Sequence, residues 1–400
     1  MENVYIIDTV RTPVGKYGGS LSSIRPDDMA SYVIGKIIER NPIEGHHIND
    51  VIVGCANQAG EDNRNIARMS SLLAGLPETV PGVTVNRLCA SSLEAIIQGA
   101  RAIKSGEADM IIAGGVESMS RAPYSIPKNV SGAAMFGNLT AYDTALGWRY
   151  PNKKMEILFP LETMGETAEN VAERWGITRE EQDAFALASH QKAAKAKDAG
   201  ILAEEIVKMP IIGKKGEISF VEHDETIRPD TSLEKLSTLP PAFRKGGSVT
   251  AGNSSSLNDG AAMVLMASEK AVKQFNLQPM ARYITSSAVG VDPRYMGIGP
   301  VYAIRRILAN TGMTIEDIGL VEINEAFAAQ ALACKKELSI VDEQLNIHGG
   351  AIAIGHPLGM SGARISGALL RNLHRTNHRY GIAALCIGVG QGLAVLYERV

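Results

Sequence analysis

Residues 83–115 read "VTVNRLCASSLEAIIQGARAIKSGEADMIIAGG", and this stretch decides the fold. It opens on a β-branched run that predicts a strand over 82–85, and small residues then introduce a helix over 91–105. An apolar run that ends in glycines predicts a second strand over 109–114. A strand, a helix and a strand in this order predict a layered α/β architecture.

The same rhythm continues on either side of this stretch. We expect strands over Val4–Ile7 and Asp50–Gly54, and helices over Asp27–Arg40 and Ile66–Leu73. It breaks between about 120 and 249 and resumes afterwards.

The break is a long irregular segment with scattered aromatic residues and turn formers, followed by helices predicted over Glu166–Trp175 and Arg179–Gly200. An irregular excursion of this length is usually functional and often covers a substrate. The alternative is a separate accessory domain.

The chain after the break repeats features of the chain before it. "INDVIVGC" (48–55) resembles "IEDIGLVE" (315–322), and "ADMIIAGG" (108–115) resembles "IAALCIGVG" (382–390), at similar separations along the chain. This repetition predicts two similar α/β halves with the irregular segment inserted between them. The predicted division is 1–119 completed by about 250–278, then 120–249, then 279–400.

Composition excludes several classes of protein. The 400 residues carry a formal net charge of -3, which argues against nucleic acid or an anionic membrane as the main partner. No apolar run approaches the roughly 18 residues of a membrane helix, and the N-terminus does not read as a signal peptide. The four cysteines show no C-x-x-C spacing, so we expect no metal site, no disulfide framework and a cytoplasmic location.

Cys89 lies where the predicted helix begins. Unpaired backbone N–H groups and the positive end of the helix dipole favour a thiolate over a thiol there, and the thiolate is the nucleophile. The alternative is a buried structural cysteine, which is how we interpret Cys55 and Cys334.

A nucleophilic cysteine needs a base, and of the eight histidines His348 and His356 stand in suitable surroundings. His356 lies in "AIAIGHPLGMSGA", after an apolar run that reads as a strand, between a glycine and a proline. Flanking residues of this kind fix the ring, so that it can take a proton from a thiol or polarise a carbonyl. The alternative is a buried, hydrogen-bonded histidine.

Two further features carry possible chemistry. Cys386 ends a predicted strand in "LCIGVGQG", whose glycines expose backbone N–H groups; a strand rather than a helix follows, which argues against a dinucleotide site and a dehydrogenase. Asn324, in "VEINEAFAAQAL", stands at the entry of a predicted helix. It either caps that helix or holds a water in the site.

Together these motifs resemble the thiolases. "NRLCAS", "NEAFA", "GGAIAIGHPLGMSGAR" and "CIGVGQG" stand in the order and spacing of that family, and "RTPVGKYGG" and "TAGNSSSLNDGAA" also fit. The likeness spans essentially the whole chain. It implies the thiolase fold, two αβα halves with an inserted loop domain, and the strongest likeness is to degradative and 3-oxoadipyl-CoA members.

The resemblance also implies an activity: reversible, CoA-dependent cleavage of a 3-ketoacyl-CoA to acetyl-CoA and a shortened acyl-CoA. Cys89 is then the acylated nucleophile, His356 activates it, and Cys386 exchanges a proton with the acetyl α-carbon. Asn324 holds a water that completes an oxyanion hole with His356. The backbone N–H groups of Cys89 and Gly388 form a second hole.

Coenzyme A is implied as a substrate, with no cofactor, and the assembly is implied to be a homotetramer, a dimer of dimers. The positions that match CoA contacts in the family are Arg228, Met164, Ala251, Ser255 and Phe327. A local salt bridge is the alternative for Arg228.

The chain departs from the family pattern at Ser92, Ser256, Thr163 and Lys235. Ser92 and Ser256 replace glycines, which leaves the shape of the acyl pocket open. Thr163 replaces the histidine of short-chain biosynthetic members, which disfavours that subtype.

The acyl tail is a separate hypothesis. If the substrate ends in a carboxylate, as 3-oxoadipyl-CoA does, we expect Arg149 or Arg87 near its far end, because a guanidinium binds a carboxylate bidentately. The alternative is that Arg149 pairs with Asp143 and pins its loop.

Two rival enzyme functions are an acetyl-CoA C-acetyltransferase and a ketoacyl synthase. A ketoacyl synthase lacks the second cysteine. A non-catalytic lipid-binding relative would be expected to lose Cys89, His356 or Cys386.

Overall fold

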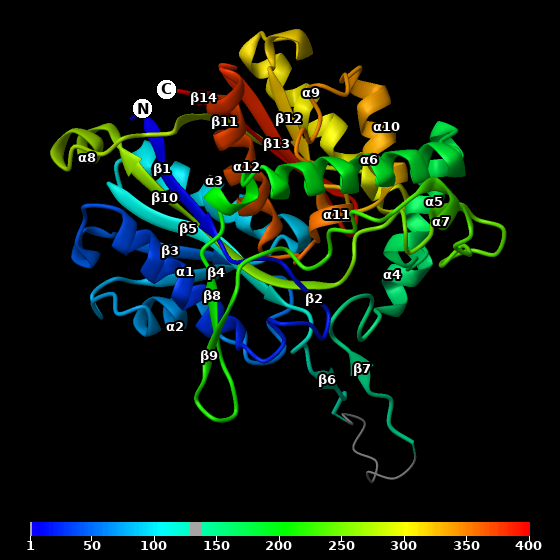
Figure 1. Cartoon of the computed structure of the whole chain (residues 1–400), viewed down its shortest axis with the longest axis horizontal. Coiled ribbons are helices and arrows are strands. Elements are labelled where there is room, and N and C mark those ends of the chain that lie inside the picture. The colour runs from blue at the N-terminus through cyan, green and yellow to red at the C-terminus, as the bar shows by residue number, and fades with distance from the viewer. Residues whose placement is uncertain (1, 129–137) are drawn as a thin grey trace.

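A computed structural model describes residues 2–128 and 138–400. Its main feature is a ten-stranded sheet in the order β12-β13-β14-β11-β1-β10-β5-β3-β4, with β2 paired to β10 (Figure 1). The strands of this sheet are β1 (Val4–Arg11), β2 (Gly15–Lys16), β3 (Asp50–Gly54), β4 (Gly82–Val85), β5 (Met110–Ser118), β10 (Asn258–Ser268), β11 (Ala281–Gly290), β12 (Leu320–Ile323), β13 (Tyr380–Ile387) and β14 (Gln391–Arg399).

The sheet consists of two halves with the same strand order. In the first half β1-β10-β5 are antiparallel and β5-β3 parallel; in the second β11-β14-β13 are antiparallel and β13-β12 parallel. The repeats predicted from sequence fall on matching strands: 48–55 on β3 and 315–322 on β12, with 108–115 on β5 and 382–390 on β13. The repeat of α/β halves is therefore confirmed.

Helices form three layers around the two halves. α3 (Ser91–Ser105) and α12 (Ser361–Thr376) pack against each other and against the strands of both halves, and most of their residues are buried. The outer faces are covered by α1 (Pro26–Arg40) in the first half and α9 (Gly299–Thr311) in the second. The predicted layered α/β class is confirmed.

Helix boundaries follow local signals. α1 begins with Pro26 in its first turn beside two acidic residues, which suits the unpaired N–H groups there. α3 ends at Gly106, whose φ of 79° is left-handed and favours glycine. The remaining helices of the two halves are α2 (Ile66–Leu73), α8 (Glu269–Gln274), α10 (Ala328–Leu338) and α11 (Ala351–Ile354), with short 3₁₀ turns at Gly45–His47, Leu88–Ala90, Pro293–Ile298 and Ile315–Asp317. A further 3₁₀ turn, Leu202–Glu204, belongs to the insertion.

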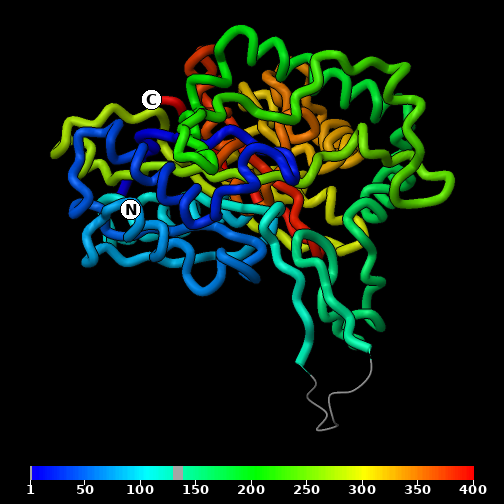
Figure 2. Tube along the Cα trace, turned by 60° about the horizontal axis from the view of Figure 1, so that its bottom comes forward, coloured from blue at the N-terminus to red at the C-terminus, as the bar shows by residue number. Residues whose placement is uncertain are grey.

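The inserted segment leaves the sheet after Ser118 and returns at Asn258. It begins as an arm that carries β6 and β7 and projects from the body (Figures 1 and 2); within the predicted insertion, 129–137 lie outside the described residues. Its elements are β6 (Tyr124–Ser125), β7 (Tyr142–Asp143), α4 (Lys153–Leu158), α5 (Met164–Trp175), α6 (Arg179–Asp198), β8 (Met209–Ile212), β9 (Ile218–Val221) and α7 (Leu233–Ser237).

One element differs from the prediction. The apolar run before His356 was expected to be a strand, but Ala351–Ile354 forms the short helix α11, closed by hydrogen bonds from Ile354 N to Gly350 O and from Gly355 N to Ala351 O. A run this short carries no periodicity that separates a strand from a buried helical turn. Among the described residues, no helix has the length and apolar character needed to cross a membrane.

A buried ion cluster fastens the end of the insertion to β1. Arg11, with a side chain 2 % exposed, donates through Nη1 and Nη2 to Asp224 at 2.7 and 2.9 Å and through Nε to Glu205 at 2.7 Å. Asp224 Oδ1 also accepts the backbone N–H of Val14 at 2.8 Å. The returning chain is thus held at the strand that joins the two halves.

We predict that Asp224→Asn lowers the free energy of unfolding by about 3 kcal/mol, because it leaves a buried guanidinium short of counter-charge. Urea denaturation at pH 7 measures the change. The control is Asp230→Asn, which removes an exposed partner of Lys235 and should change stability by less than about 1 kcal/mol. Equal effects of the two variants would contradict the assignment.

Candidate functional site

Cys89 stands on a strained bend between β4 and α3. The preceding Leu88 adopts a φ of 47°, a left-handed conformation that costs a residue other than glycine about 1–3 kcal/mol. The bend is held by Asn86, whose Oδ1 accepts the Leu88 N–H at 2.9 Å, and by Ser91, whose Oγ accepts the Arg87 N–H at 2.9 Å. These bonds hold Cys89 at the beginning of α3.

The resting state of Cys89 differs from the expectation. Burial raises the pKa of the Cys89 thiol to about 11, against the opposing effect of two backbone N–H groups, those of Gly388 and of Cys89 itself. The expected thiolate is therefore wrong for the unliganded protein, because desolvation outweighs the helix end. Cys89 needs a base. The two N–H groups are those predicted for the second oxyanion hole, and both are directed at the sulfur.

The second half brings Cys386 close to Cys89. Burial, and after it the neighbouring Cys89, hold the pKa of the Cys386 thiol well above its ordinary value. The turn after it contains Val389 at a φ of 63°, a second strained residue. A Cβ on Gly388 would lie 3.4 Å from both Leu88 Cδ1 and Met164 Sδ, so the two strained bends face each other. The turn leads into the antiparallel strand β14, which excludes the dinucleotide-binding context.

His356 is held at three points. Its backbone N–H donates to Asn258 Oδ1 at 2.9 Å, its Nδ1 lies 2.6 Å from Ser361 Oγ, and its Nε2 lies 3.3 Å from Asn324 Nδ2. Ser361 donates its single hydroxyl proton to Pro357 O at 2.8 Å, so Nδ1 must donate in the contact with Ser361. Nε2 then carries the lone pair.

The protonation state of His356 suits a general base. Burial, and after it the positive charge of Arg364, lower the pKa of His356 to about 3, so the ring is neutral at pH 7. Arg364 is 2 % exposed, and its Nε and Nη2 have no hydrogen-bond partner among the described residues. A neutral imidazole whose Nε2 carries the lone pair can accept a thiol proton, once Asn324 Nδ2 gives up its contact with that nitrogen.

Asn324 directly follows β12 and does not cap a helix. The next helix, α10, begins after Phe327, and Asn324 is fixed instead by its backbone N–H bond to Ala384 O at 3.0 Å. Its Oδ1 is buried and has no partner among the residues that the structure describes. That geometry suits a bound water, which remains a prediction.

The positions predicted to contact CoA divide into two groups. Met164 and Phe327 pack in one apolar cluster with Cys386, and Ser255 N donates to Ala326 O of the same cluster at 3.0 Å. Ala251 is exposed on the same loop as Ser255. Their roles remain predictions.

Arg228 lies apart, exposed, and its backbone N–H donates to His190 Nδ1 at 3.2 Å. Nearby Asp230 pairs with Lys235 at 2.7 Å, and not with Arg228, which does not support the alternative of a local salt bridge for Arg228.

The two arginines proposed for the acyl tail are already engaged. Arg149 donates to Asn57 Oδ1 at 3.1 Å, Asn57 O at 3.0 Å and Thr144 O at 2.8 Å, so it pins its loop through Asn57 rather than Asp143. Arg87 pairs with Glu94 at 2.8 Å and donates to Gln391 at 3.0 Å. To bind the carboxylate of a substrate, either side chain would have to give up these partners.

The serines and the threonine that depart from the family pattern have structural partners. Ser92 is fully buried, and its Oγ accepts the Ala363 N–H at 2.9 Å across the two halves. Ser256 donates to Asn258 Oδ1 at 3.0 Å, and Thr163 caps α5.

Sequence reasoning missed four residues that shape the site: Leu88, Asn258, Ser361 and Arg364. Leucine carries no signal for a left-handed backbone. Asn258 lies 98 residues from the histidine that it holds. Ser361, five residues after His356, had a usable signal in the sequence "HPLGMS", where a hydroxyl near a helix start is placed to reach back.

Comparisons with known proteins agree with this geometry. Residues 4–270 match the family model described as Thiolase, N-terminal domain, and 277–399 match Thiolase, C-terminal domain. The chain is 52% identical to the 3-oxoadipyl-CoA/3-oxo-5,6-dehydrosuberyl-CoA thiolase of Escherichia coli K12 and 44% identical to the 3-ketoacyl-CoA thiolase of Photorhabdus laumondii, each over the full length of both chains. The crystal structure of Bacillus anthracis acetyl-CoA acetyltransferase superposes with a TM-score of 0.94 at 42% identity, covering 100% of this chain and 99% of that one.

Stability should fall in acid because of His356. The unfolded chain binds a proton there below pH about 6.5 and the folded chain only near 3, so the free energy of unfolding decreases as the pH falls between these values. At pH 5 the loss is about 2 kcal/mol. Urea denaturation of the wild type and of His356→Asn at pH 7 and pH 5 measures this loss. The decrease in the free energy of unfolding between the two pH values should be smaller in His356→Asn by that amount. His223→Asn, at an exposed position, is the control; a pH dependence unchanged in His356→Asn would refute the assignment.

Proposed function

Since the chain belongs to the thiolase family and is therefore an acyltransferase that cleaves 3-ketoacyl-CoA with CoA, we propose that its preferred substrate is 3-oxoadipyl-CoA. The observation that carries this proposal is 52% identity over the whole chain to a relative named for that substrate, against 44% and 42% to relatives named for other acyl groups. Reaction on general 3-ketoacyl-CoA substrates or acetoacetyl-CoA is the alternative.

In the proposed first step His356 Nε2 removes the Cys89 proton, and the sulfur attacks the 3-keto carbon. The bond between C2 and C3 then breaks, and the electron pair leaves on C2 as the enolate of acetyl-CoA. Cys386 donates its proton to C2, which releases acetyl-CoA and leaves the shortened acyl group on Cys89. The water on Asn324 and the protonated His356 stabilise the enolate oxygen.

The second step restores the enzyme. Cys386, now a thiolate, takes the proton of the incoming CoA thiol, and the CoA sulfur attacks the acyl thioester. The N–H groups of Cys89 and Gly388 stabilise the tetrahedral oxyanion. Cys89 then leaves as a thiolate and recovers its proton from His356. All atoms and charges balance with CoA as the only co-substrate, so we propose that no cofactor takes part.

CoA is proposed to enter along the loop that carries Ala251 and Ser255. Met164 and Phe327, which pack beside Cys386, would line the pantetheine arm. Arg228, which is exposed and whose acidic neighbour Asp230 pairs with Lys235, would contact a phosphate.

Assembly and location complete the proposal. β4 is an edge strand that leads directly into Cys89, and the residues of the arm include exposed Tyr124, Ile126 and Leu139. An edge and an arm of this kind support a homotetramer, a dimer of dimers. The two catalytic thiols must stay reduced, which supports a cytoplasmic location.

The proposed roles predict a trapped intermediate. Cys386→Ser should acylate at Cys89 yet turn over at least about a hundredfold more slowly, because a serine hydroxyl is a far weaker acid than a thiol. Mass spectrometry after mixing with acetyl-CoA should find the acetyl group on the Cys89 peptide. Cys334→Ser, which removes a buried thiol of the second half, is the control and should turn over normally. An adduct elsewhere, or normal turnover of Cys386→Ser, would exclude these roles.

Substrate choice is tested by kcat/KM for 3-oxoadipyl-CoA, 3-oxohexanoyl-CoA and acetoacetyl-CoA. We expect 3-oxoadipyl-CoA to exceed 3-oxohexanoyl-CoA by at least about tenfold, the value of one well-made ionic contact. Arg149→Ala should lower kcat/KM for both by the same factor, because its guanidinium is engaged with Asn57 and Thr144. A loss confined to the carboxylate substrate would show instead that Arg149 reads the tail.

A further inference from the structure

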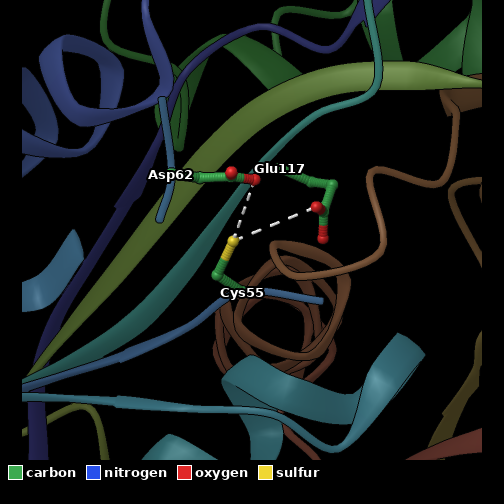
Figure 3. Close-up of side chains that lie close together, drawn as sticks. All are labelled: Cys55, Asp62 and Glu117. Carbon is green, nitrogen blue, oxygen red and sulfur yellow. Dashed lines mark hydrogen bonds between the residues drawn. The ribbon is translucent and has the colours of Figure 1, made fainter. Parts of the chain in front are cut away.

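A buried carboxylate lies beneath the catalytic bends and has no place in the mechanism above. Glu117, on β5, is 1 % exposed and faces Cys55 and Asp62, both also buried (Figure 3). The Cys55 sulfur lies 3.6 Å from Asp62 Oδ2 and 4.0 Å from Glu117 Oε1. A thiol and two carboxylates within 4.8 Å of one another are the ligand types of a metal site.

The oxygens of this cluster are occupied by backbone donors. Asp62 accepts the N–H groups of Gly60 at 2.9 Å and Gln58 at 3.2 Å, one on each oxygen. Glu117 accepts three, one on Oε1 and two on Oε2. Because the lone pairs point at N–H groups, the cluster holds loops together and is not arranged around a cation.

Two of the N–H groups bound by Glu117 belong to the loop after β3. Ala56 N lies 3.0 Å from Oε2, and Asn57 N lies 3.1 Å from Oε1. Ala56 O in turn accepts Asn86 Nδ2 at 2.9 Å, and Asn86 Oδ1 accepts the N–H of Leu88 at 2.9 Å. Three consecutive hydrogen bonds therefore connect Glu117 to the strained residue that precedes Cys89.

The third N–H group belongs to the loop that carries His356. Gly359 N, three residues after the histidine, donates to Glu117 Oε2 at 2.8 Å across 242 residues of sequence. This loop lies directly on β5: a Cβ on Gly359 would stand 2.3 Å from Val116 O, and one on Gly115 would stand 2.0 Å from Gly359 O. The same carboxylate oxygen therefore holds the loop of His356 and, through Ala56 and Asn86, the bend that precedes Cys89.

Glu117 acts on these loops at close range in a dry environment. Burial raises its pKa to about 7, a shift to which the charge of Asp62 adds and which the three N–H groups oppose. The titratable groups that face it are Cys55 and Asp62, and its charge also reaches the thiol of Cys89. A carboxylate that is buried to this degree forms strong and directional hydrogen bonds with the N–H groups that donate to it.

We propose that Glu117 is a positioning residue that sets where Cys89 stands relative to His356 by binding Ala56, Asn57 and Gly359 with one carboxylate. The assignment rests on the proposed function, since it concerns the two groups that carry out that reaction. Its effect is on geometry: a displacement of about 1 Å between a nucleophile and its base costs up to about a hundredfold in rate.

The test compares Glu117→Gln with Asp62→Asn in the full-length protein. An amide at 117 keeps one acceptor oxygen but turns an NH₂ group toward a backbone donor, so one loop must move. Asp62→Asn removes a charge from the same buried cluster but touches neither Ala56 nor Gly359. We expect Glu117→Gln to lower kcat at least about tenfold with KM within about threefold, and Asp62→Asn to leave both within about threefold.

A second readout needs no substrate. The rate of Cys89 alkylation by iodoacetamide at pH 8 should fall at least about fivefold in Glu117→Gln and remain normal in Asp62→Asn, with melting temperature measured for each. If Glu117→Gln does not fold, Asn86→Ala carries the test. Its side chain is exposed, and it breaks only the link from Ala56 to Leu88, so alkylation should slow by a similar factor.

Unchanged kcat and alkylation in Glu117→Gln, or equal losses in both cluster variants, would overturn the assignment. So would normal alkylation in Asn86→Ala if Glu117→Gln does not fold. Failure of the proposed function is a different outcome: the wild-type protein would then lack thiolysis, while the alkylation comparison would still report on the position of Cys89.

Discussion

The site depends on one steric constraint: the two halves must meet backbone to backbone where α3 and α12 begin. Across the two halves, a Cβ on Gly362 would stand 2.4 Å from Leu93 N, and one on Gly115 would stand 2.0 Å from Gly359 O. Real side chains do not approach so closely, so these positions exclude every larger residue. The contact places the bend of Cys89, from one half, beside the loop of His356, from the other.

Burial then determines the chemistry that these groups can perform. Burial holds the pKa of the Cys89 and Cys386 thiols above their ordinary value and that of His356 below it, so all three groups are uncharged at pH 7. In the proposed reaction, charge develops on Cys89 only when His356 takes its proton, next to the N–H groups directed at the sulfur. Oriented donors in a water-poor pocket stabilise such charge more than solvent does, because they need not reorganise.

Local signals predicted well, and distant contacts did not. The strand over 82–85 and the helix over 91–105 match β4 and α3 residue for residue, because β-branched residues and the stop at Gly106 act within a few positions. The apolar run before His356 failed because four residues are too few to show a period. Cys89, His356 and Asn324 were singled out from sequence because their flanking residues are unusual. Glu117 and Asn258 were not singled out. A glutamate within β5 and an asparagine at the start of β10 are ordinary residues until their partners, 242 and 98 residues away, are known.

The pairing of β11 with both β1 and β14 has a consequence for connectivity. Val4 is paired with Tyr283 on one side of β11, and Arg399 is paired with Ala281 on the other, so the two ends of the chain flank the same two-residue step and emerge together (Figure 1). A short linker that passes over the end of β11 would therefore join the end of β14 to the start of β1, and new ends could open at the tip of the β8–β9 hairpin, 213–217. Strand order fixes this architecture, whereas the point at which the polypeptide begins does not.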